Sequence, residues 1–463
     1  MLPKTPHNEA VSMSATPAIA AKSMSLPLTI LGCVLWLLVA SPVFVERDIY
    51  RYAGAILAII ALFHYLGLKD RPRTNWLGWL CMAWGTYVVL RFVAIYLMTR
   101  DLGASDWLFA FPFFFPILGV AFSLYAAQLE RIIAAFFAVA LVMLAATTHF
   151  ERIFSGETVV PLIMNNQIHG AVACGLILIS ASFWLLHYMT TKSSNAAFAR
   201  FAYIGAPLII VICFVAIYGA KSKGVWLALV VTLPIMGLVA LTYLRRKMGL
   251  VIVVCAAALL IVGVYAVRHN LDETAGPTVA ATISLLEGIE QGSDFSGVVS
   301  GTIESTTTPV SMDERLQLWY NAGELIFSAP VFGWGNEWLE QWRQTRYAHV
   351  QYTLMHNGYL EILIRFGAFG AVVMTAILAA LVASVWRAFR SGFIPRAAFH
   401  TYMLGLFYFA LTLLSNSNNR LAIGESLALL SSAFACWCNM QLSAKSAAAH
   451  EQTALAGQGA TQA

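Results

Sequence analysis

The chain has 463 residues, of which 59% are hydrophobic and 11% are charged, with a formal net charge of +5. A soluble protein of this length needs far more charge to cover its surface, so the composition excludes a soluble globular protein. Uncharged apolar stretches of about 20 residues recur, long enough to cross a hydrocarbon core of roughly 30 Å. A closed membrane barrel would instead show short alternating segments. The composition therefore predicts an all-α polytopic membrane protein.

Hydropathy predicts twelve transmembrane helices along the chain. Charge interrupts two of them: Arg91 lies in the third, and Glu361 and Arg365 lie in the tenth. Charged groups inside a span are costly, so each is a functional candidate. The predicted spans, in chain order, are 25–45, 52–68, 76–99, 107–128, 132–149, 170–190, 201–219, 224–244, 248–267, 358–385, 397–415 and 421–442.

The basic residues predict the orientation of these spans. Five short loops on one side carry twelve Lys and Arg residues, against seven in the short loops on the other side. Cytoplasmic loops carry the excess of basic residues, so both termini are predicted to be cytoplasmic and the long loop 268–357 to face outward. Residues 1–24 and 443–463 are predicted to be disordered cytoplasmic tails. All seven cysteines fall within predicted spans, which indicates packing rather than a disulfide framework or a zinc site.

The outward loop 268–357 is acidic and is predicted to be mostly helical. From Arg268 to Met355 it holds eleven of the 23 acidic residues and four basic ones, which disfavours a nucleic-acid partner. Short helices are predicted over 279–290 and 336–346, and the Gly-, Ser- and Thr-rich residues 291–310 are predicted to be mobile. Ser311 and Glu314 form a capping box, which predicts that a helix starts there and runs to about Phe327.

The pair His356-Asn357 stands where this loop meets the tenth span. An imidazole titrates near the working pH, so His356 is a candidate general base, with a snorkelling interfacial histidine as the structural alternative. Asn357, Glu361 and Arg365 follow one another at intervals of four residues, which places them on one face of the helix. Glu361 before Arg365 is the favourable order for an ion pair, and a buried pair that locks the helix is the preferred interpretation of Arg365.

Three basic sites are predicted on the same outward side. Lys221 and Lys223 lie between the seventh and eighth spans, where outward lysines run against the orientation rule and indicate an anion site. Arg315 lies near the start of the capped helix, with Trp319 one turn later, and its guanidinium suits phosphate oxygens. The structural alternative is a surface arginine paired with an acidic neighbour. Arg91 adds a candidate for the lining of a polar cavity. Together with His356, these residues suit an anionic lipid headgroup and a proton transfer.

Three further polar motifs are weaker signals. The segment 415–420, with Glu425 after it, is a candidate cavity lining, and the segment 165–169 suits either sugar hydroxyls or plain helix capping. Glu46-Arg47-Asp48 in the first outward loop has the acid-x-acid pattern of membrane glycosyltransferases that use lipid-linked donors, although loop charge is the better default. No Asp-x-Asp motif occurs, which disfavours a metal-dependent sugar-nucleotide transferase.

In their order, these motifs resemble the O-antigen ligase/polymerase superfamily of bacterial inner-membrane glycosyltransferases. Ser222-Lys223-Gly224 is similar to the family's Ser-Arg-Gly, with lysine in place of arginine. Arg315 and Trp319, followed by Pro330, Gly333 and Gly335, resemble its Arg-x3-Trp and Pro-x2-Gly-x-Gly elements. His356-Asn357 with Leu360, followed by Gly367 and Gly370, resembles its His-Asn-x2-Leu and Gly-x2-Gly elements. The resemblance covers residues 222–370.

The resemblance implies an O-antigen ligase of the Gram-negative inner membrane. Such an enzyme transfers O-antigen polysaccharide from undecaprenyl diphosphate to lipid A–core oligosaccharide at the periplasmic face, by metal-independent inverting chemistry without a cofactor. His356 and Arg315 are then the expected catalytic residues, and Lys221, Lys223, Arg91, Asn357 and Trp319 the expected substrate-binding residues. A single dominant loop before the tenth span favours a ligase over a polymerase. A transporter of polyprenyl-linked glycans is the alternative from another class, and no internal repeat of the kind typical of transporters is found.

Overall fold

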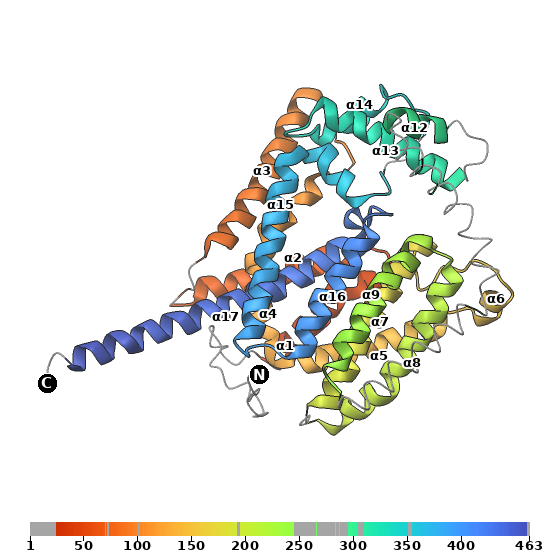
Figure 1. Ribbon diagram of the computed structural model, residues 1–463. Helices are drawn as coiled ribbons and strands as arrows, with labels where there is room; N and C mark the ends of the chain where they lie inside the picture. The colour runs from red at the N-terminus through yellow and green to blue at the C-terminus, as the bar shows by residue number, and fades with distance from the viewer. Residues whose placement is uncertain are drawn as a thin grey trace, which may run out of the picture.

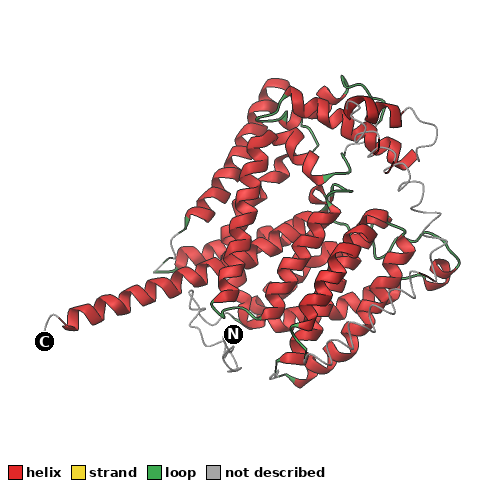
Figure 2. Ribbon diagram, viewed as in Figure 1, coloured by secondary structure: helices red, strands yellow, loops and turns green. Residues whose placement is uncertain are grey.

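The structure is a computed structural model that describes residues 25–69, 71, 74–100, 102–104, 106–191, 195–244, 265, 283, 287, 295–303, 310–350 and 354–460. Within these residues the chain forms helices and connecting loops, and no strand is present (Figure 2). The prediction of an all-α polytopic membrane protein is confirmed.

Nine helical segments of the described residues are long and apolar enough to cross a membrane, against twelve predicted spans. One of them, Asp106–Thr147, has 42 residues and contains two of the predicted spans. The predicted span 397–415 corresponds to α16 (Arg396–Thr412), which at 17 residues is slightly shorter than the others. The predicted span 248–267 lies almost wholly outside the described residues. The count of twelve therefore stays a prediction.

The helices before the outward loop follow the predicted order, and two of the three after it end later than predicted. The last helix, α17, continues to Ala460, beyond the predicted end of its span at residue 442 (Figure 1). The bounds of the described α-helices are α1 Leu26–Ala40, α2 Ile49–Gly67, α3 Trp76–Thr99, α4 Phe115–Tyr125, α5 Leu129–Thr147, α6 Phe150–Phe154, α7 Gln167–Thr190, α8 Ala196–Ala220, α9 Lys223–Leu241, α12 Phe295–Ile303, α13 Val310–Ser328, α14 Trp338–Trp342, α15 Gly358–Arg390, α16 Arg396–Thr412 and α17 Ala422–Ala460. Short 3-10 segments are η1 Ser41–Val43, η2 Asp106–Phe114, η3 Ala126–Gln128, η4 Gly335–Glu337 and η5 Asn418–Arg420.

Two apolar clusters hold the membrane part together. The first joins α1, α2, α3, α4, α15 and α17, and the second joins α5, α7, α8, α9 and α16. α4 and α5 are separated only by the 3-10 turn η3, yet they pack on different partners, α17 and α8 respectively. Burial of these apolar faces fixes which helices are neighbours, and thereby which connecting loops meet at each end of the bundle.

The connections that were predicted to face outward meet at one end of the bundle, here called the loop face. Val45 bridges to Ile163, which joins the first connection to the one before α7. The Gly358 N–H donates to the Leu413 carbonyl at 2.8 Å, and the Arg420 guanidinium donates to the Ala104 carbonyl. Loops far apart in the sequence are thus tied to one another, which is consistent with the predicted alternation of spans.

Helices α12, α13 and α14 lie together at the loop face and form the outward unit (Figure 1). The unit has an apolar core of its own, in which Trp338 and Trp342 pack with Leu318 of α13 and Met355. Residues 295–303 form the helix α12, where the sequence predicted a mobile segment. α13 already begins at Val310, so Ser311 lies inside its first turn rather than at the predicted N-cap. The predicted helix 279–290 lies largely outside the described residues.

α15 is broken at Gly367, whose φ of +59° and ψ of −161° are accessible to glycine alone. A break leaves backbone groups without helical partners, which is costly in a membrane. The turn Pro330–Gly335, here called the Pro-Gly turn, supplies the missing partners. Its Pro330 and Val331 carbonyls accept from the N–H groups of residues 368 and 369 at 2.8 and 2.9 Å, and the Trp334 N–H donates to the Ile364 carbonyl at 2.8 Å.

The glycines of the two motifs interlock at this break. A side chain at Gly333 would lie 2.6 Å from the Arg365 backbone, and one at Gly367 would collide with Val331. The segment of α15 before the break is therefore held against the outward unit, with His356-Asn357 at its start. This gives a structural reason for the Pro-x2-Gly-x-Gly and Gly-x2-Gly elements.

Candidate functional site

Met355, the residue before His356, is held through both of its backbone polar groups. The Met355 N–H donates to Glu361 Oε1 at 2.7 Å, and the Met355 carbonyl accepts from the Trp319 indole N–H at 3.1 Å. His356 itself has a φ of +48°, a conformation that non-glycine residues adopt only where their surroundings impose it. Asn357 then caps α15, because its Oδ1 accepts from the N–H groups of Tyr359 and Leu360. The direction of the imidazole is thus set by tertiary contacts.

Glu361 is fully buried and anchors this arrangement. Its Oε1 also accepts from the Ser417 hydroxyl at 2.7 Å, and its other oxygen pairs with Arg365. Arg365 pairs in turn with Asp106 and lies over the Trp338 ring at 4.4 Å. The predicted Glu361–Arg365 pair is confirmed, and it belongs to a larger buried network. Asp106 was not among the predicted site residues, and its only signal in the sequence was an acidic residue beside the predicted start of a span.

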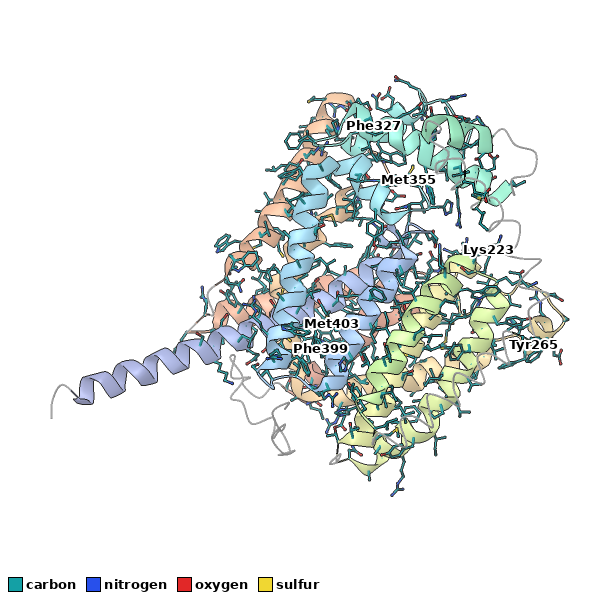
Figure 3. The ribbon with its side chains drawn as sticks, viewed as in Figure 1. Lys223, Tyr265, Phe327, Met355, Phe399 and Met403 are labelled. Atoms are coloured by element: carbon teal, nitrogen blue, oxygen red, sulfur yellow. The ribbon has the colours of Figure 1, made fainter. Side chains whose placement is uncertain are left out.

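His356, Arg315 and Lys223 come together at the loop face. Arg315 lies close enough for its charge to affect the titration of both His356 and Lys223. The three come from the segment before α15, from α13 and from the first residue of α9. Figure 3 shows Lys223 at the start of α9, at the end of the bundle that faces the outward unit, and Met355 lies between Lys223 and the unit's helices in this view. Side chains 41 to 133 residues apart in sequence therefore form one basic, histidine-containing cluster.

Burial and charge both favour the neutral imidazole. Desolvation lowers the pKa of His356 below its usual value, and the nearby Arg315 guanidinium lowers it further. A hydrogen bond with the Asn416 side chain and the charge of Glu361 oppose this but are weaker. Burial also lowers the pKa of the Arg315 guanidinium, which remains a cation at physiological pH. At pH 7 the site thus holds a neutral imidazole, able to accept a proton, beside a cation.

The two lysines of the predicted anion site point to different partners. Lys221 has a φ of +48° and its ammonium donates to the Gly156 carbonyl at 2.6 Å, which ties the end of α8 to the loop after α6. Lys223, in contrast, lies close enough to Arg315 for the two positive charges to interact. Gly224 lets α9 approach the 413–421 connection, since a side chain there would lie 2.0 Å from the Ser415 hydroxyl. Lys223 is therefore brought to the site and Lys221 is turned to a backbone carbonyl.

Arg91 is engaged with backbone at the break in α15. Its guanidinium donates to the Gly333 carbonyl at 2.7 Å, to the Arg365 carbonyl at 3.1 Å and to the Phe332 carbonyl. Tyr87 accepts a fourth, longer hydrogen bond. This arginine, which the sequence marked as a candidate for substrate binding, joins α3 to the Pro-Gly turn.

A carboxylate–imidazole pair lies near His356. Glu46 Oε2 is 3.0 Å from His169 Nδ1 and accepts from the Asn165 N–H at 2.9 Å. Burial would raise the pKa of Glu46, but the hydrogen bonds from His169 and Asn165 and the charge of His169 outweigh burial and lower it. His169 lies close enough to affect the titration of His356. Two motifs that were weak in the sequence, Glu46-Arg47-Asp48 and 165–169, thus meet beside the site.

The comparisons with known proteins agree with the resemblance seen in the motifs. A family model described as O-antigen ligase matches residues 208–375. No curated protein sequence matches the chain. The matched residues run from the second half of α8 to beyond the break in α15. This part of the chain, which holds Lys223, Arg315 and His356, is similar to the O-antigen ligase family.

Proposed function

We propose that this protein is an O-antigen ligase, which transfers O-antigen polysaccharide from undecaprenyl diphosphate to lipid A–core oligosaccharide. The observation that carries the proposal is the gathering of His356, Arg315 and Lys223 from three separate segments of the family-matched region at one end of a membrane bundle. Two cations suit a diphosphate, and a neutral imidazole suits the activation of a hydroxyl.

In the proposed reaction, the acceptor hydroxyl attacks the anomeric carbon of the donor sugar. A bond forms between the acceptor oxygen and that carbon, the bond from the carbon to the diphosphate oxygen breaks, and the configuration inverts. His356 takes the hydroxyl proton as the new bond forms. Undecaprenyl diphosphate leaves with the electron pair, and Arg315 and Lys223 stabilise the negative charge that develops on it. The step requires no metal ion and no redox cofactor.

The other predicted site residues receive supporting roles in this proposal. Trp319 and Asn357 position His356 through the Met355 carbonyl and the cap of α15. Arg91 holds the Pro-Gly turn, and Lys221 holds the end of α8. We place the loop face on the periplasmic side of the Gram-negative inner membrane, where both lipid-linked substrates would reach it. The excess of basic residues in the opposite loops supports this orientation.

The experiment is a lipopolysaccharide gel of a deletion strain, with and without the wild-type gene restored. For a ligase we expect every O-antigen band to disappear while lipid-linked polymer accumulates, and restoration to return the ladder. A surviving band with a single repeat unit on the core would identify a polymerase instead.

A second measurement separates catalysis from transport. Purified protein should join the lipid-linked donor to lipid A–core without an energy source, and His356→Ala should abolish this while the protein stays folded. An unchanged ladder in the deletion strain, or no transfer by purified wild-type protein, would contradict the ligase and favour another glycan or transport.

A further inference from the structure

The Pro-Gly turn lies at a depth where α3 still faces lipid. Arg91, whose guanidinium binds the carbonyls of Phe332 and Gly333, comes eight residues before the end of α3 at Thr99. At 1.5 Å per residue, α3 continues for about 12 Å beyond Arg91. Two large apolar side chains in this remaining stretch, Leu97 and Met98, are 59% and 80% exposed. The apolar surface of the span therefore extends past the level of the turn.

The turn presents apolar side chains at the same level. Val331 and Phe332, whose side chains carry no polar group, are 55% and 54% exposed. Phe332 also packs against Phe369 of α15, with the two rings tilted and their centroids 5.5 Å apart. An open apolar groove of about 840 Å³ runs along α3 from Trp79 to Ala94, past Arg91, and is also lined by Met82, Tyr87 and Leu90 among others. The exposed apolar face of the Pro-Gly turn is therefore continuous with the lipid-facing surface of α3.

The carbonyl groups of the turn are satisfied as the hydrocarbon region requires. Non-helical backbone is tolerated at membrane depth only where its polar groups find partners within the protein. The carbonyls of Pro330 and Val331 accept from α15, and those of Phe332 and Gly333 accept from Arg91. Four consecutive carbonyls thus have protein partners. This accounts for the presence of Arg91 inside a span. Its guanidinium donates hydrogen bonds to turn carbonyls that have no N–H partner in the turn itself or in the broken helix α15.

We propose that the Pro-Gly turn is embedded in the lipid leaflet beside α3, with Val331 and Phe332 in contact with acyl chains and with Arg91 holding the turn there. The outward unit is then anchored in the bilayer at this turn, next to the break that positions His356. This inference concerns the membrane contact alone, and it stands or falls separately from the proposed ligase activity.

The test places a fluorescent label at single added cysteines in protein reconstituted into phosphatidylcholine vesicles. An environment-sensitive NBD label at Phe332→Cys or Val331→Cys should be quenched by doxyl-labelled phosphatidylcholine and little affected by aqueous iodide. Leu90→Cys, on the lipid-facing side of α3, serves as the lipid control, and Arg343→Cys, exposed in the outward unit, as the aqueous control. Wild-type protein labelled in parallel gives the background of the native cysteines.

Iodide quenching at Phe332→Cys as strong as at Arg343→Cys would overturn the proposal, and so would protection from both quenchers, which would mean that protein covers the turn. Combining Arg91→Leu with Phe332→Cys tests the role of the arginine, because loss of its donors should move the label into water. Unchanged quenching by lipid in this variant would refute that role. If the double variant does not fold, the single-cysteine proteins still decide whether the turn lies in lipid.

Discussion

The surroundings of His356 favour the neutral form of its imidazole. Burial and the Arg315 cation hold its pKa below the usual value, so the base form dominates from neutral pH upward. We expect kcat/KM for transfer to be independent of this group above pH 7 and to fall as the pH drops through the lowered pKa. Arg315→Gln removes one cause of the depression, so the acid limb of its residual activity should move to higher pH. A limb that stays in place in Arg315→Gln would contradict the assignment of that limb to His356.

Glu361 should influence the same profile in the opposite direction. Its carboxylate favours the protonated imidazole, so Glu361→Gln should move the acid limb to lower pH. The variant also weakens the hold on the Met355 N–H, and we expect kcat to fall about 10- to 100-fold with little change in the KM of the donor. Ser417→Ala, which removes one hydrogen bond but no charge, is the matched control and should leave the limb unmoved. A purely structural role for Glu361 would lower the thermal stability of the variant without shifting the limb.

The two lysines provide a second matched pair. Lys223→Met should raise the KM of the diphosphate-linked donor about tenfold or more, because it removes one of the two cations that we propose bind the diphosphate. Lys221→Met removes a hydrogen bond to the Gly156 carbonyl and should leave that KM nearly unchanged. The measurement is the donor dependence of the initial rate with purified proteins. A larger effect in Lys221→Met than in Lys223→Met would reverse the assignment.

At the scale of elements, the broken helix α15 and the Pro-Gly turn form one unit. Gly367→Ala and Gly333→Ala each place a side chain at a φ near +60° and against opposing backbone, so we expect each to cost at least about 1–3 kcal/mol of stability. The thermal unfolding midpoint in detergent would show this as a clear drop. Gly405→Ala in α16, with open space around it, is the control and should be neutral or slightly stabilising. A midpoint for Gly367→Ala equal to that of the control would mean that α15 closes its break without penalty.

At the scale of the whole molecule, a buried charge network joins the membrane bundle to the outward unit. Arg365 is fully buried between Asp106, Glu361 and Trp338, and these come from three different connections or helices. Asp106→Asn removes one anion from a cation that cannot reach water, and should cost about 1–3 kcal/mol. We expect faster proteolysis of the outward unit in this variant. Asp48→Asn breaks an exposed ion pair with Arg51 and should not change the rate of cleavage. Equal rates in both variants would show that the network does not hold the unit.

Much of the fold was predictable because a membrane imposes a strong constraint on sequence. Spans must be long, apolar and helical, so hydropathy alone found nearly every described membrane helix. The helices of the outward loop were harder to predict. α12 forms from Gly, Ser and Val residues with little helical preference, and its contacts with α13 belong to the tertiary structure. The helical continuation of α17 to Ala460 likewise has no hydropathy signal.

The sequence by itself determined the membrane class of this protein, the order of most of its spans and the identity of the motif residues Lys223, Arg315 and His356. The tertiary structure alone decided which charges face one another. Arg91 and Lys221 have side chains that suit an anion, yet backbone carbonyls 242 and 65 positions away in sequence engage them. Asp106 is recognised as part of the site only through its ion pair with Arg365. Glu46 and His169 are recognised only through their contact with each other, because they come from separate segments of the chain. The physical reason is that the interactions of a charged side chain depend on the groups within a few ångströms of it. The packing of the bundle determines which groups those are.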